Sequence, residues 1–146
     1  MKTFLKISGL LIVSSSMLSA ACAPKNLIFS CQTVKGKIIE VCDNKNTITY
    51  SFGKSGQTPE ITVNAKRNKV TTYQWNGIGS WMSYSVNIPN GKTNYNVFFG
   101  VDRNDENHPI EAGVMVNIGD KTVATVKCAE DKITNNIEGV DLPLEQ

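Results

Sequence analysis

Apolar and polar residues alternate along most of the chain, and the pattern is clearest over residues 70–103. One face of the strand expected there carries Met82, Tyr84, Val86 and Ile88. A second alternating run extends from Tyr95 to Val101. Between the two runs stands the pair Asn90-Gly91, whose residues tolerate the positive φ angles of a tight turn. The pattern therefore predicts a β-hairpin in the middle of the chain.

The same period of two predicts most of the remaining structure. Further strands are expected at residues 27–34, 38–42, 47–52, 61–63, 112–118 and 122–128. The first three predict a β-meander, whereas one or two turns of helix are expected within 130–136. About eight or nine short antiparallel strands are typical of a β-sandwich or a small β-barrel. We therefore expect one all-β domain over residues 22–146, with a short C-terminal tail in which Pro143 excludes a regular central strand.

Residues 1–21 have the composition of a secretory signal peptide. Lys2 and Lys6 precede an apolar core over residues 10–18, and small residues follow it. The apolar run is shorter than a membrane span requires. We expect this segment to be removed on export, which places the rest of the chain in the periplasm.

Cys22 follows the expected cleavage site and has two interpretations. Ser19 and Ala21 suit an ordinary signal peptidase that cuts before Cys22. A cysteine at this place also resembles the bacterial lipobox, although Ser19 stands where leucine is usual. Acylation would make Cys22 a lipid anchor instead of half of a disulfide, and the protein an outer-membrane lipoprotein.

The charge of the chain does not indicate a nucleic-acid partner, and none is expected. The chain has 15 basic and 13 acidic residues, and loss of Lys2 and Lys6 with the signal peptide makes the two numbers equal. The one short basic run, residues 66–69, is interpreted as a solvated turn between two strands.

The cysteines of the expected domain are interpreted as disulfide partners. Cys31, Cys42 and Cys128 lie in or at the ends of expected strands, where cysteines of exported proteins are usually paired. A two-residue turn at Lys35-Gly36 would permit a local Cys31–Cys42 bridge. We favour Cys31–Cys128, which would tie the first strand to the last and which the chain-entropy model values at about 4 to 5 kcal/mol. Cys42 would then be free or paired with Cys22.

No arrangement of residues indicates catalysis. The sequence has no glycine-rich phosphate loop, nucleophile elbow or zinc-binding helix motif. The single histidine, His108, is interpreted as a solvated loop residue. Asp102, Asn104 and Glu106 have the spacing of a calcium loop, but its later glycine and glutamate are missing, so an ordinary polar loop is expected. We expect no enzymatic activity, no metal and no cofactor.

Residues 75–81 form the most distinctive loop. Gly77 and Gly79 permit unusual backbone angles, and Trp75 and Trp81 bracket them. In a functional interpretation this loop enters the cleft of a partner. In a structural interpretation, which we favour, the two tryptophans cap the end of the core.

The cysteines at Phe29-Ser30-Cys31 and at the end of residues 124–128 resemble the layout of the periplasmic and membrane-bound inhibitors of C-type lysozyme. The resemblance implies a small antiparallel β-barrel with a disulfide between its terminal strands. It also implies a glycine- and serine-rich loop that blocks the enzyme's cleft, although the family's order of these residues is not reproduced. The corresponding binding residues are Gly77, Gly79, Ser80, Trp81 and Tyr84.

Two classes of function follow from the sequence. The first is an exported binding protein with a lysozyme-like hydrolase as its partner, acting through residues 76–80. The alternative is a structural or envelope-associated β domain, lipid-anchored or free, without enzymatic activity. In either class, contact with a membrane is expected only through lipidation at Cys22.

Overall fold

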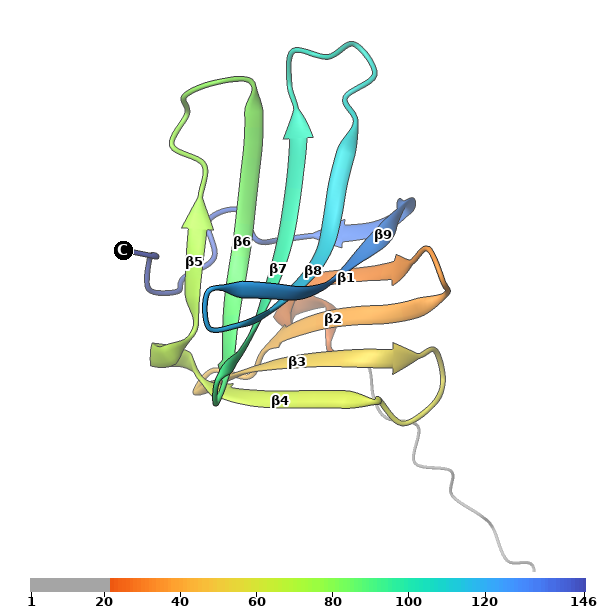
Figure 1. The fold of residues 1–146 in the computed structure, drawn as a ribbon, viewed down its shortest axis with the longest axis vertical. Coiled ribbons are helices and arrows are strands. Elements are labelled where there is room, and N and C mark those ends of the chain that lie inside the picture. The colour runs from red at the N-terminus through yellow and green to blue at the C-terminus, as the bar shows by residue number, and fades with distance from the viewer. Residues whose placement is uncertain (1–21) are drawn as a thin grey trace, which may run out of the picture.

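The computed structural model describes residues 22–146, so the expected signal peptide lies outside the described residues (Figure 1). Nine antiparallel strands form one sheet in the order β4-β3-β2-β1-β9-β8-β7-β6-β5, which curls into a half-barrel. The strands are β1 (Leu27–Thr33), β2 (Lys37–Asp43), β3 (Thr47–Lys54), β4 (Ile61–Lys66), β5 (Thr71–Gln74), β6 (Trp81–Asn90), β7 (Thr93–Asp102), β8 (Ile110–Ile118) and β9 (Lys121–Asn135). Two short 3-10 turns accompany them, η1 (Pro24–Asn26) and η2 (Arg67–Lys69). The expected all-β fold is confirmed.

The core lies between the two halves of the curled sheet, whose strands cross each other in Figure 1. Ile48 and Tyr50 of β3 and Val86 and Ile88 of β6 are at most 1% exposed, as the period of two requires for one buried face. The ring of Tyr50 stacks on that of Tyr95, with 4.7 Å between the ring centroids. Burial raises the pKa of the Tyr50 hydroxyl, and the neighbouring Tyr95 adds to the rise.

The long last strand joins the two halves of the sheet. The first part of β9 pairs with β8, and the second part pairs with β1, where Ile133 lies opposite Cys31. The expected helix within residues 130–136 is therefore wrong, because β9 continues to Asn135. Residues 130–135 form a strand because β1 is an interior strand, whose N–H and C=O groups need hydrogen-bond partners on both sides.

The central hairpin is confirmed, although its turn is displaced by one residue. Asn90 lies opposite Thr93, which leaves Gly91 and Lys92 as the two residues of the turn. The φ angle is +62° at Gly91 and is not positive at Lys92. This combination matches a type II′ turn, in which glycine takes the first central position.

All four cysteines form disulfides, Cys31–Cys128 and Cys22–Cys42. The favoured Cys31–Cys128 pairing is confirmed, and Cys42 is paired with Cys22. The two-residue turn at Lys35-Gly36 is wrong, because Cys31 lies opposite Ile39 and the connection is one residue longer than expected. Two disulfides are typical of a protein that resides in an oxidising, extracytoplasmic compartment.

The C-terminal tail covers the edge strand β5. Thr72 donates its N–H to the carbonyl of Pro143 over 2.8 Å and accepts the N–H of Glu145 over 3.0 Å. Ile137 and Leu142 are buried against the core at 0% and 8% exposure. Pro143 contributes only its carbonyl, so its missing donor costs no sheet hydrogen bond. Within residues 22–146, no helix is long and apolar enough to cross a membrane.

Candidate functional site

Two loops lie together at one end of the sheet. The loop over residues 75–80 connects β5 to β6, and the loop over residues 103–109 connects β7 to β8, both at the top of Figure 1. Arg103 donates its backbone N–H to the carbonyl of Ser80 over 2.9 Å. Its guanidinium carbon lies 5.2 Å from the centroid of the Trp75 ring, within the range of a cation–π contact. The second loop therefore braces the first.

The 75–80 loop is ordered by its own hydrogen bonds. The side-chain oxygen of Asn76 accepts the N–H of Ile78 over 3.0 Å, and the Trp75 indole donates to the carbonyl of Ile78 over 3.0 Å. Gly77 and Gly79 have φ angles of +84° and +85°, a region that other residues rarely adopt. A Cβ atom at either glycine would meet nothing within 4 Å, so both face open space.

The structure separates the binding residues expected from the sequence into three groups. Gly77, Gly79 and Ser80 lie together in the loop. Trp81 is 41% exposed on the outer face of β6, whereas Tyr84 is 4% exposed and packs in the core. Burial raises the pKa of the Tyr84 hydroxyl, and the Glu138 carboxylate adds to the rise. The expectation that Tyr84 supports a partner contact is wrong for this conformation, because residues 81 and 84 point to opposite faces of one strand.

The interpretation that both tryptophans cap the end of the core holds for only one of them. Trp75 is partly buried and packs against the core cluster. Trp81 lies on the outer face, away from the core. Ile78 was not among the binding residues expected from the sequence, yet it is 77% exposed at the tip of the loop. A lone apolar residue between two glycines was the available signal, since glycines offer it no side chain to pack against.

The 103–109 loop is held by turns in which aspartates accept backbone N–H groups. Asp102 accepts from Asn104 over 3.0 Å, and Asp105 accepts from Asn107 over 2.9 Å. The Nδ1 atom of His108 lies 3.3 Å from the carbonyl oxygen of Asp102. These contacts give the aspartates of this loop a structural role.

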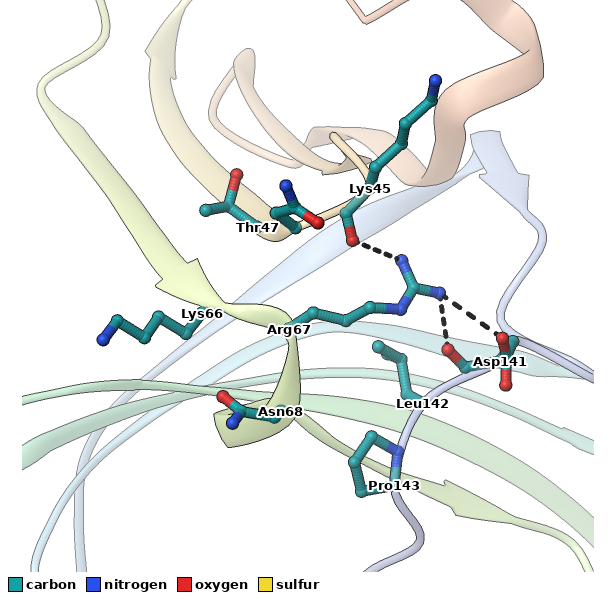
Figure 2. A pocket seen from close by; sticks show the side chains of 9 residues that line it. Lys45, Thr47, Lys66, Arg67, Asn68, Asp141, Leu142 and Pro143 are labelled. Carbon is teal, nitrogen blue, oxygen red and sulfur yellow. Dashed lines mark hydrogen bonds and ion pairs between the residues drawn. The ribbon is translucent and has the colours of Figure 1, made fainter.

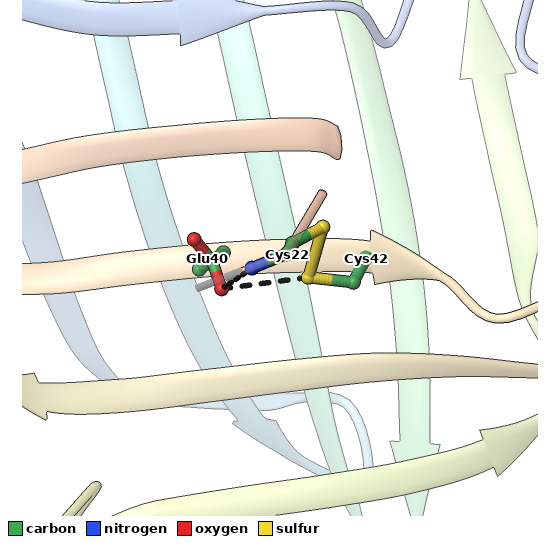
Figure 3. A group of neighbouring side chains, drawn as sticks. All are labelled: Cys22, Glu40 and Cys42. Carbon is green, nitrogen blue, oxygen red and sulfur yellow. Dashed lines mark hydrogen bonds between the residues drawn. A yellow bond between two sulfur atoms is a disulfide. The ribbon is translucent and has the colours of Figure 1, made fainter. Parts of the chain in front are cut away.

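The environment of Cys22 bears on its two interpretations (Figure 3). Its sulfur is bonded to Cys42, and its backbone N–H donates to the Glu40 carboxylate over 3.2 Å. These three side chains form a group with metal-ligand spacing, but the two sulfurs bonded to each other are not thiolates, the form that binds metals. A thioether to lipid would need the same sulfur atom, so acylation and this disulfide exclude each other in one molecule.

A hollow of about 850 Å³ lies between the β3–β4 end of the sheet and the C-terminal tail (Figure 2). Arg67 reaches across it, donating to the Asp43 carboxylate over 2.6 Å and to the carbonyls of Lys45 and Asp141 over 3.2 and 2.6 Å. The bond to Arg67 holds the pKa of Asp43 below its usual value. The interpretation of residues 66–69 as a solvated turn is therefore wrong for Arg67, which ties the tail to the sheet.

Among the described residues, no buried side-chain nitrogen or oxygen lacks a hydrogen-bond partner. The two loops at the end of the sheet are distinguished by their hydrogen-bonded backbone and by the exposed apolar residue at the tip of the first loop. No protein-family model, curated protein or solved structure matches the chain.

Proposed function

We propose that this chain is an exported binding protein of the bacterial envelope that inserts its 76–80 loop into the cleft of a partner, a C-type lysozyme. The observation that carries the proposal is a loop that is both ordered and protruding. Ile78 is 77% exposed at its tip, while two hydrogen bonds and the contact with Arg103 fix its backbone. Since the loop is already ordered, docking costs little conformational entropy.

The chemistry of the loop suits a narrow cleft lined by acids. Gly77 and Gly79 keep the backbone slim, and Ile78 supplies an apolar anchor for the wall of the cleft. Ser80 is the hydroxyl donor nearest the tip and would bond the catalytic carboxylates of the enzyme. Asp105 and Glu106 are exposed in the neighbouring loop and favour a partner with a basic rim.

The proposed location is the periplasm. Its support is the signal-peptide composition of residues 1–21 together with the two disulfides. The pairing of Cys22 with Cys42 favours a free periplasmic protein over a lipoprotein, because the sulfur that would carry the lipid is used in the bridge.

The test is the rate at which a C-type lysozyme lyses cell walls in the presence of the oxidised mature protein. The Gly79→Val, Ser80→Ala double variant puts a branched side chain at a φ of +85° and removes the hydroxyl. A matched control is the Ser55→Ala, Gly56→Val double variant, since Gly56 has a φ of +71° and equally open surroundings in another turn.

We expect inhibition by the wild type and the control, and at least a tenfold weaker inhibition by the loop variant. A folded, oxidised wild type that leaves lysozyme fully active contradicts the choice of partner. Equal inhibition by all three proteins contradicts the role of the loop.

A further inference from the structure

A groove of about 400 Å³ crosses the outer face of β5 to β9, on the side of the sheet opposite the core. Tyr73, Trp81, Phe98 and Met115 supply its apolar surface, and Ser85 and Gly100 stand among them as small residues. Ser85 lies opposite both Tyr73 and Phe98 in the strand register, so the two rings flank one small side chain. This volume lies within the roughly 300–1,000 Å³ typical of small-molecule sites.

Trp81 forms a fixed platform at one end of the groove. A Cβ atom built on Gly100 would lie 2.7 Å from Cε2 and 3.0 Å from Nε1 of the indole, so the ring lies across the glycine. Trp81 nevertheless remains 41% exposed. The absence of a side chain at Gly100 therefore lets the backbone support the indole while part of the ring stays open for stacking.

The polar groups of the groove are neutral or balanced in charge. Ser83, Asn96 and Thr125 offer uncharged donors and acceptors, and the charged side chains Glu111 and Lys127 have opposite signs. A charged ligand would gain no net attraction from this set. The side-chain nitrogen of Asn96 donates to the Ser85 hydroxyl over 3.4 Å. A purely apolar segment would cover the remaining amide and hydroxyl groups without offering them partners, which costs free energy.

We infer that this groove binds a neutral oligosaccharide, with one sugar ring stacked on Trp81 beside the Ser83 hydroxyl and a further sugar unit bonded to Asn96. A pyranose ring presents an apolar C–H face and a polar edge, which is the combination that the groove displays. The groove begins at Trp81, next to the 76–80 loop, but it extends over the outer face of the sheet and does not depend on a lysozyme partner.

Fluorescence can assign binding to Trp81, because the chain has two tryptophans. The Trp75→Phe variant reports on Trp81 alone, and the Trp81→Phe variant reports on Trp75 alone. Each is titrated with cellotetraose and with chitotetraose up to tens of millimolar, and a heparin tetrasaccharide serves as the anionic comparison. We expect a saturable change with at least one neutral tetrasaccharide in Trp75→Phe and none in Trp81→Phe.

Calorimetry of the wild type, Trp81→Ala and Gly100→Ala completes the test. Loss of the ring, or its displacement by the new methyl group, should weaken binding of the neutral sugar at least tenfold. Circular dichroism confirms that each variant folds. The inference is overturned if neither neutral tetrasaccharide binds, if the heparin fragment binds more tightly than both, or if folded Trp81→Ala keeps wild-type affinity.

Discussion

Removal of the Cys31–Cys128 bridge should destabilise the domain more than removal of the Cys22–Cys42 bridge. The cysteines of the two bridges are separated by 97 and 20 residues. In the chain-entropy model, loops of these lengths correspond to about 4.7 and about 3.3 kcal/mol of stabilisation at 25 °C. The expected gap is therefore about 1.4 kcal/mol in the free energy of unfolding.

Burial acts in the same direction as loop length. Cys31 and Cys128 are 2% and 7% exposed, so their replacement by alanine also removes buried sulfur atoms from the core. In the other bridge Cys42 is also buried, at 8% exposure, but Cys22 is only partly buried near the start of the described chain, so less packing is lost there. The calculated gap is consequently a lower bound.

The assay is equilibrium unfolding in urea of the oxidised double-alanine variants, followed by tryptophan fluorescence. For an m-value of about 2 kcal/mol/M, the loss of Cys31–Cys128 lowers the midpoint by roughly 2 M. Thiol titration confirms that the other bridge stays closed in each variant. Equal midpoints, or a lower midpoint for the variant without Cys22–Cys42, would refute the loop-length reasoning.

Three further predictions concern single residues. Because Arg67 lowers the pKa of Asp43, the ionised Asp43 carboxylate stabilises the fold at pH values above its usual pKa of 3.8, and this contribution is lost as the pH falls below that value. In urea unfolding across this acid range, Asp43→Asn should therefore lose less stability than wild type. Burial raises the pKa of Tyr50, so stability should fall as the pH rises above the usual value of 10.0; Tyr50→Phe should flatten that decline, and an identical decline would contradict it. Periplasmic wild type should carry no fatty-acid label and two disulfides by mass spectrometry; label that disappears in Cys22→Ala would show lipidation instead.

The sequence was sufficient for features that depend on local pattern. The alternation in residues 82–88 and 95–101 predicted both strands of the central hairpin, because one buried face imposes a period of two. The same period places Trp81 and Tyr84 on opposite faces of the strand, so the alternation itself contained the reason to exclude Tyr84 from a site that includes Trp81. The Cys31–Cys128 pairing was favoured because it joins the first strand to the last.

Features that depend on non-local pairing were beyond the sequence pattern. Residues 130–135 are mostly polar and carry no clear strand signal, and they become part of β9 because β1 needs a second neighbour. The contact between Arg67 and Asp141 joins segments far apart in the chain, so composition alone gave a solvated turn. The groove likewise required the strand order, which brings Tyr73 of β5 and Phe98 of β7 to either side of β6.

The most direct measurement of the proposed function is amide hydrogen exchange in the presence and absence of a C-type lysozyme. Docking through the 76–80 loop predicts slower exchange over residues 76–80, with smaller protection over the bracing loop at residues 103–109. The outer groove and the hollow around Arg67 should exchange at unchanged rates. Unchanged exchange at residues 76–80 at saturating lysozyme, or protection confined to another surface, would contradict docking through this loop.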